Sequence, residues 1–183
     1  MAQTATIYTM AIDLADMDRG VYETLALRVA QHPSESEEYL VTRVLAYCLE
    51  YTEGITFSNG ISDPDEPSLS IRDLTGALQV WIDIGTPEAA RLHRAAKAAP
   101  RVVVYIHKDP AQFLRRISGE KIHRSANLEI YEIRRSMLSE LVARLKRRMT
   151  FSLSVTDGDL LIAIDDDMIE GRAERHVLAG EAR

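Results

Sequence analysis

The chain has 183 residues, of which 46% are hydrophobic, 27% charged and 6% aromatic, and its formal net charge is −6. These values predict one soluble domain over residues 1–183, large enough to bury a core of its own. No apolar run reaches the roughly 20 residues that cross a bilayer, and the N-terminus has no basic-then-apolar leader. The single cysteine, Cys48, excludes an internal disulfide and a cysteine-built zinc site. We therefore expect a cytoplasmic protein without a membrane partner.

The acidic balance argues against a broad electrostatic coating of nucleic acid. It leaves open an enzyme that meets a phosphodiester locally, through a bound cation. Two stretches, 91–101 and 134–148, are basic, and their simplest interpretation is the solvated faces of amphipathic helices.

The N-terminal third alternates between apolar and polar residues in two different ways. Thr4–Ile12 has the alternation of a strand, whereas the apolar stripe of Val21, Leu25 and Val29 predicts a short helix over 21–30. Ser34 and Glu37 have the spacing of a capping box, so a second helix is expected over 34–51.

The middle of the chain predicts strands at 55–58, 66–72 and 77–84, with a turn at 73–76 between the last two. Thr86 as N-cap and Pro87 in the first helical position predict a helix over 87–99. The continuous apolar run 101–107 is typical of a central strand buried on both faces.

The C-terminal third predicts a helix over 109–117, a strand over 128–133 and a basic amphipathic helix over 137–148. Asp157-Gly158 lies between two apolar runs, 151–155 and 160–164, and indicates a β-hairpin. The charged segment 165–183 is expected to be a flexible tail. Together these elements predict a mixed α/β fold.

Two acidic residues flank the turn at 73–76 and suggest a site. Pairing Asp73 with Gly76 carries Glu66 opposite Asp83, with both side chains on one face of the sheet. A carboxylate inside an apolar strand is costly to bury without a partner, and a divalent cation bound by oxygen ligands suits two facing carboxylates. The alternative is that Asp83 caps the helix after Pro87 or pairs with a basic residue such as Arg91.

Three short motifs in this order resemble the YaeQ family of bacterial proteins. They are His32-Pro33-Ser34-Glu35, Asp65-Glu66-Pro67 and Trp81-Ile82-Asp83-Ile84-Gly85-x-Pro87, and the likeness extends from Ala5 to Gly158. The resemblance implies a variant of the restriction-endonuclease-like PD-(D/E)XK architecture. Its mixed sheet would be flanked by helices, with a nuclease-like core at 34–107 and an extra C-terminal β-hairpin.

In that superfamily the second core strand supplies an acid and the third supplies (D/E)-x-K. The resemblance carries these acids onto Glu66 and Asp83, as ligands of Mg²⁺ or Mn²⁺. The lysine position is Gly85, so the motif is broken here.

The resemblance implies that a basic residue of the following helix replaces the missing lysine. Arg94 is the first choice, with Arg91 and Lys97 one turn to either side. Glu38 resembles the auxiliary acid that some superfamily members add to the metal site, and Glu35 is its nearest rival.

The leading functional hypothesis is a metal-dependent phosphodiesterase that acts on nucleic acid. The second is a non-catalytic binding module that keeps the fold but has lost turnover with the lysine. The third is an interaction protein that holds an acidic partner on the basic face of 137–148. The oligomeric state is left open.

Overall fold

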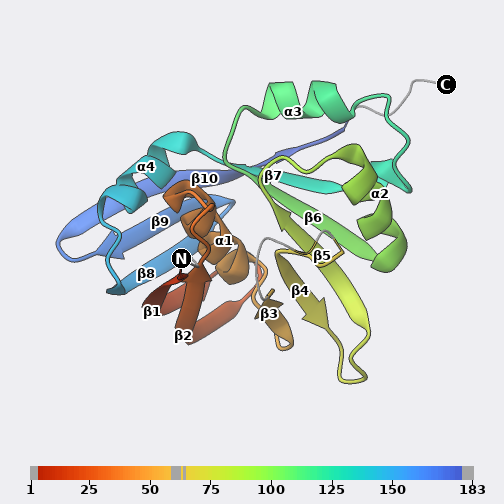
Figure 1. Cartoon of the computed structure of the whole chain (residues 1–183). Helices are drawn as coiled ribbons and strands as arrows, with labels where there is room; N and C mark the ends of the chain where they lie inside the picture. Colours follow the sequence, from red (N-terminus) through yellow and green to blue (C-terminus); the bar gives the residue numbers. More distant parts are fainter. Residues whose placement is uncertain (1–3, 59–62, 64, 179–183) are drawn as a thin grey trace.

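The computed structural model describes residues 4–58, 63 and 65–178, and within them it confirms the mixed α/β class. One ten-stranded sheet runs in the order β2-β1-β8-β9-β10-β7-β6-β5-β4-β3, curved around helix α1 (Figure 1). The strands are β1 (Thr6–Asp16), β2 (Val21–Gln31), β3 (Ile55–Phe57), β4 (Leu69–Arg72), β5 (Leu78–Ile84), β6 (Arg101–Ile106), β7 (Glu129–Ile133), β8 (Arg148–Thr156), β9 (Asp159–Ile164) and β10 (Asp167–His176). The helices are α1 (Glu37–Leu49), α2 (Ala89–Ala98), α3 (Pro110–Ile117), α4 (Arg135–Ala143) and a 3₁₀ turn at Ser125–Asn127.

The predicted helix over 21–30 is wrong, because this segment is strand β2. It pairs antiparallel with β1 along its whole length. Leu25, Leu27 and Val29 are buried, while the residues between them are exposed. A spacing of four residues fits one helix stripe and one strand face equally well, so Val21, Leu25 and Val29 could not separate the two structures.

Helix α1 begins later than the capping box predicts. Its N-cap is Ser36, whose side chain accepts a hydrogen bond from the Tyr39 amide, and the Ser34 hydroxyl instead contacts Nδ1 of His32. Almost the whole helix is buried inside the curved sheet (Figure 1). Burial raises the pKa of the Cys48 thiol to about 12, so this cysteine is a core side chain rather than a thiolate nucleophile.

The order predicted between 34 and 107 is confirmed as α1, β3, β4, β5, α2, β6. Part of the segment between β3 and β4, residues 59–62 and 64, lies outside the described residues. Helix α2 begins at Ala89, after Glu88 rather than Thr86, and the Arg116 guanidinium holds the Thr86 carbonyl oxygen at 2.6 Å. Strand β6 is buried on both faces, as its continuous apolar sequence predicts.

In the C-terminal third, the predicted helix over 109–117, strand over 128–133 and hairpin are confirmed, as α3, β7 and the pair β8–β9, and two predictions are corrected. Strands β8 and β9 form the hairpin around Asp157 and Gly158, which both have positive φ. Helix α4 ends at Ala143, so the predicted basic helix over 137–148 is wrong in its second half. Residues 167–176 are not a tail, because strand β10 lies between β9 and β7 in the sheet. The last five residues, 179–183, are outside the described part.

Helices cover the two faces of the sheet unequally (Figure 1). α1 and α4 pack in the larger core, on the concave face, together with residues of both sheet halves. α2 and α3 cover β5, β6 and β7 from the other side and form a smaller core around Trp81, Val104 and Phe113. Among the described residues, no helix is long and apolar enough to cross a membrane.

Candidate functional site

The turn between β4 and β5 lacks the pairing that would place Glu66 opposite Asp83. The Asp73 amide donates to the Ala77 carbonyl oxygen at 3.0 Å, so Asp73 pairs with Ala77 and not with Gly76. Gly76 is an extra residue in the left-handed conformation, with a φ of +84°. An inserted residue of this kind shifts every later pair of an antiparallel ladder.

A second irregularity, at the end of β4, moves the register again. Leu69 consequently lies opposite Ile82. One position further out, Ser68 rather than Glu66 is the residue beside Asp83. The predicted pairing of Glu66 with Asp83 is wrong because the turn and the bulge each add one residue on the β5 side of the hairpin. The sequence indicates only the first of these, through Gly76.

Asp83 is paired with an arginine of α2. Its side chain is only 2% exposed, and the Arg91 guanidinium donates to both of its oxygens at 2.8 Å, a bidentate ion pair. The hydrogen bond with Asp83 raises the pKa of Arg91, which also lies over the Trp81 ring at 5.4 Å. The same guanidinium holds the Glu66 carbonyl oxygen at 2.6 Å and so fixes the loop that carries Glu66.

The other proposed basic residues of α2 lie elsewhere. Arg94 is half exposed, and its nearest acid is the exposed Asp65 at 3.8 Å. Lys97 is exposed in the last turn of the helix. Of the three basic residues that could replace the missing lysine, Arg91 is the one that contacts Asp83.

The backbone conformation of Gly85, two residues after Asp83, explains why a glycine is found at this position. Its φ is +90°, a value that a lysine would adopt only with strain. The amide of Gly85 donates to the Tyr105 carbonyl oxygen at 2.8 Å and holds the chain in this conformation at the end of β5.

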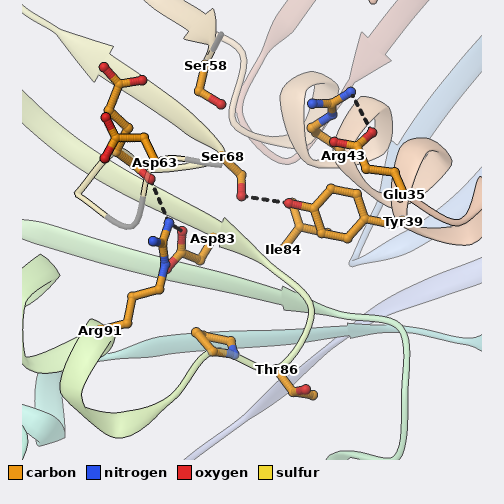
Figure 2. Close-up of a pocket in the computed structure, with 12 residues that line it drawn as sticks. Glu35, Tyr39, Arg43, Ser58, Asp63, Ser68, Asp83, Ile84, Thr86 and Arg91 are labelled. Carbon is orange, nitrogen blue, oxygen red and sulfur yellow. Dashed lines mark hydrogen bonds and ion pairs between the residues drawn. The ribbon is translucent and has the colours of Figure 1, made fainter. Parts of the chain in front are cut away.

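Asp83 and Glu66 line a common cavity of about 230 Å³ at the end of β5, beside the beginning of α1 (Figure 2). The wall carries four carboxylates, two guanidinium groups and four hydroxyl side chains. These residues are Glu35, Asp63, Glu66, Asp83, Arg43, Arg91, Tyr39, Ser58, Ser68 and Thr86. We call this space the Asp83 cavity.

Glu35, the rival of Glu38 in the sequence, is a buried acid of this cavity. It forms an ion pair with Arg43 at 3.3 Å (Figure 2). Burial raises the pKa of Glu35, and the charge of Arg43 opposes this shift. Both partners keep an unsatisfied atom, because Oε1 of Glu35 and Nε of Arg43 are buried without a hydrogen-bond partner. Such atoms are rare in native proteins and point to a site that binds something else.

Tyr39 lies between the two ion pairs of the cavity (Figure 2). Its hydroxyl group is 3.0 Å from the Ser68 hydroxyl. Burial raises the pKa of Tyr39, while the bond with Ser68 and the charge of Arg43 lower it. The phenol is therefore a neutral hydrogen-bonding group that can donate to a ligand oxygen.

Glu38 does not line the Asp83 cavity. It borders a second cavity of about 580 Å³ between the beginnings of α1, α3 and α4. His107 also lines this second cavity. It is 8% exposed, and burial lowers its pKa, so the ring is neutral at pH 7. Its Nδ1 is a further buried atom without a hydrogen-bond partner.

A different polar cluster lies at the far end of α1. Arg101 bonds to Glu50 at 2.6 Å and to Glu129 at 2.7 Å, and the Tyr105 hydroxyl donates to Glu50 at 2.8 Å. The bond with Arg101 lowers the pKa of Glu129. Tyr131 completes this group by stacking on Tyr105. We call these residues the Arg101 network.

The oxygen-rich wall of the Asp83 cavity suits a hard divalent cation. Each carboxylate oxygen has more than one lone pair, so the bonds from Arg91 leave acceptor capacity on Asp83. Glu66 is exposed, and Oε1 of Glu35 has no partner among the described residues. Mg²⁺ and Mn²⁺ prefer ligands of this type.

The fold and the cavity together define a class: a mixed α/β protein with an acid-rich cavity at the edge of a partly parallel sheet. Comparison with known proteins then gives the family. A family model described as "YaeQ protein" matches residues 1–172, so the chain belongs to the YaeQ family.

Two bacterial relatives agree with this membership over nearly their whole length. "Uncharacterized protein YaeQ" of Escherichia coli (strain K12) is 29% identical over 171 residues, which cover 93% of this chain and 94% of that protein. The protein of the same name from Salmonella typhi is 30% identical, over 89% of this chain and 91% of its own.

Two solved structures share the fold. The crystal structure of YaeQ protein from Pseudomonas syringae has a TM-score of 0.87 and 29% identity, over 98% of this chain and 99% of its own. That of the YaeQ protein from Xanthomonas axonopodis pv. citri has a TM-score of 0.87 and 31% identity, over 96% and 100%.

Proposed function

We propose that the Asp83 cavity is the active site of a metal-dependent phosphodiesterase of restriction-endonuclease-like architecture that acts on nucleic acid. The observation that carries this proposal is the composition of the cavity wall. A buried aspartate at the end of β5 shares one small space with three further carboxylates and two guanidinium groups, supplied by separate segments of the chain. Carboxylates suit a cation, and guanidinium groups suit the phosphate that the cation would hold.

Within this proposal Asp83 and Glu66 would hold Mg²⁺ or Mn²⁺, with Glu35 rather than Glu38 as the auxiliary acid. The bound cation would polarise a phosphate oxygen and lower the pKa of a water molecule. Glu66 has the freedom to reach a cation because its carboxylate is exposed, while its backbone is held by Arg91.

Arg91, rather than Arg94, would be the basic residue of α2 that replaces the missing lysine. Its guanidinium already lies in the cavity wall, where it would stabilise negative charge on a phosphate. A guanidinium stays protonated in proteins and so cannot act as a base. Proton removal from water would therefore fall to another group, such as the substrate's own phosphate.

One observation favours the second candidate, a module that binds without turnover. Arg91 occupies both oxygens of Asp83, and Gly85 removes the lysine that would serve as proton acceptor. In this candidate the cavity holds a cation or a phosphate group but does not cleave the ester.

The experiment is a cleavage assay with Mg²⁺ or Mn²⁺ on single- and double-stranded DNA and RNA. Wild type is compared with Glu66→Gln, Asp83→Asn and Arg91→Ala, and Arg94→Ala is the matched control on the same helix. We expect cleavage to fall at least about 100-fold in the three cavity variants and to stay within about twofold in the control.

Cleavage that survives in Glu66→Gln and Asp83→Asn would contradict the proposal. Cation binding that depends on Glu66, without cleavage of any substrate form, would instead establish the binding module. Equal losses in Arg91→Ala and Arg94→Ala would remove the special role of Arg91.

A further inference from the structure

A separate group of metal-binding side chains lies on β7 and β10 and shares no residue with the wall of the Asp83 cavity. Glu132, Glu174 and His176 each offer one ligand atom, and these atoms lie within 4.8 Å of one another. All three side chains are partly buried. We call this group the Glu132 cluster.

The pairing of β7 with β10 brings these side chains together. Glu132 is directly opposite Glu174, and His176, two residues further along β10, faces the same side of the sheet. Two like charges in directly opposed positions are destabilising. Arg134 is 3.6 Å from Glu174, but the two side chains are 61% and 46% exposed, so this pair compensates little. Arg135 and Lys108 line the second cavity together with Glu132, and among the described residues neither forms an ion pair with the cluster.

The spacing within the cluster is close to that of metal ligands. Nε2 of His176 is 2.9 Å from Oε2 of Glu132. Two ligands that are each about 2.1 Å from one tetrahedral ion lie about 3.4 Å apart, a separation that a small side-chain rotation produces. The glutamate side chains have enough rotatable bonds to bring Glu174 within the same distance.

One residue of the cluster, Glu132, also borders a space that an additional ligand can enter. Glu132 lines the second cavity of about 580 Å³, together with His107. His107 is 8% exposed, and its Nδ1 is buried without a hydrogen-bond partner. A buried imidazole atom without a partner is an independent indication that this cavity receives a ligand.

We propose that Glu132, Glu174 and His176 bind a divalent transition-metal ion, with Zn²⁺ as the best match. One imidazole and two carboxylates favour this class of ion over Mg²⁺, which prefers oxygen ligands alone. Three protein ligands leave at least one position for water or a substrate. This site is distinct from the Asp83 cavity and does not depend on the function proposed for it.

The test is a titration of metal-free, tag-free protein with Co²⁺, a coloured substitute for Zn²⁺, followed by competition with Zn²⁺. Every protein carries Glu66→Gln, so that the Asp83 cavity contributes little. Glu174→Gln and His176→Gln are compared with this background. Glu170→Gln, an exposed glutamate of the same strand, is the matched control.

We expect the background protein and the control to bind one equivalent of Co²⁺, to release it to Zn²⁺, and to gain thermal stability with Zn²⁺. Glu174→Gln and His176→Gln should bind at least about 100-fold more weakly, since even outer groups around a metal change its affinity 10–100-fold. Their unfolding temperatures without metal, if unchanged, exclude a folding defect.

The proposal is overturned if the background protein binds no Co²⁺, or if Glu174→Gln binds as tightly as the control. In that case Glu132 and His176 form an ion pair only. Because Glu66 is replaced throughout, either result leaves the function proposed for the Asp83 cavity untouched.

Discussion

The two ends of α1 carry similar charged and aromatic side chains but satisfy them differently. In the Arg101 network, at the C-terminal end, Arg101, Glu50 and Tyr105 all have hydrogen-bond partners. At the N-terminal end, Glu35 and Arg43 each keep a buried atom without one. Among the described residues, the other two such side-chain atoms are in Trp81, which lies under Arg91, and His107, which lines the second cavity.

This difference separates a structural cluster from a candidate site. A buried polar network in which every group is hydrogen-bonded helps to fix a unique structure, whereas an incomplete network keeps donors or acceptors that a ligand can bond to. We therefore expect substitutions in the Arg101 network to change mainly the free energy of unfolding. Substitution of Glu66, the exposed carboxylate of the Asp83 cavity, should change mainly ligand binding.

The largest expected effect on stability is that of Arg101→Met. Glu50 would stay buried without its guanidinium partner, and we expect a loss of about 2–4 kcal/mol in the free energy of unfolding, moderated by the partial exposure of Arg101. Urea denaturation measures this loss. The exposed Arg148→Met should stay within about 0.5 kcal/mol of wild type. A similar effect in both variants would show that the network does not stabilise the fold.

The Glu35–Arg43 pair should respond differently to single and double substitution. Arg43→Met alone leaves the buried Glu35 unpaired and should lower the free energy of unfolding by about 1–3 kcal/mol. Adding Glu35→Gln should recover most of this loss, because no charge then stays buried. A double-mutant cycle measures the coupling. Losses that simply add would mean that Glu35 and Arg43 do not interact.

The two ends of α1 should also respond to pH with opposite signs. The pKa of Glu129 is lowered from 4.5 by its bond with Arg101, so its stabilisation is present above pH 4.5 and is lost as the pH falls further. The pKa of Glu35 is raised from 4.5 by burial, so stability decreases as the pH rises from 4.5 through the raised value.

Urea denaturation between pH 3 and pH 8 tests this contrast. Glu129→Gln should flatten the loss of stability on the acid side, and Glu35→Gln should flatten the decrease above pH 4.5. Changes of the same sign in both variants would contradict the assigned environments.

The smallest expected effect on stability is that of Glu66→Gln. The Glu66 side chain is exposed, and its link to Arg91 is made by the backbone carbonyl oxygen, which the substitution keeps. We expect a change below about 0.5 kcal/mol in the free energy of unfolding. A much larger loss would give Glu66 a structural role and weaken its use as a probe of the cavity.

The sequence predicts the fold correctly where the pattern of apolar and turn residues fits only one type of secondary structure. The apolar run of β6 and the Asp157-Gly158 turn each allow one structure, and both predictions are confirmed. β2 was missed because spacings of four fit a helix and a strand alike. β10 was missed because a strand with charged residues on much of its surface is identified by its neighbours in the sheet, and these come from distant segments.

The candidate site was predictable only in outline. The sequence indicated that Asp83 needs a partner, and Arg91 was among the alternatives. The choice between Arg91 and Arg94 depends on the rotation of α2 against the sheet. The choice between Glu35 and Glu38 depends on where α1 begins, because the N-cap is Ser36 and Glu35 therefore precedes the helix. The register of Glu66 depends on an irregularity at the end of β4 that no sequence pattern indicated, in addition to the extra glycine of the turn.

We propose that the Asp83 cavity binds a hard divalent cation through Glu66 and Asp83. Calorimetric titration with Mg²⁺ measures this binding with little contribution from the Glu132 cluster, because Mg²⁺ disfavours the imidazole of His176. We expect Glu66→Gln to weaken binding by about tenfold or more, while Asp65→Asn, at the exposed neighbouring residue, binds as wild type does. Equal Mg²⁺ affinity in wild type and Glu66→Gln, with both proteins folded, would contradict the proposal.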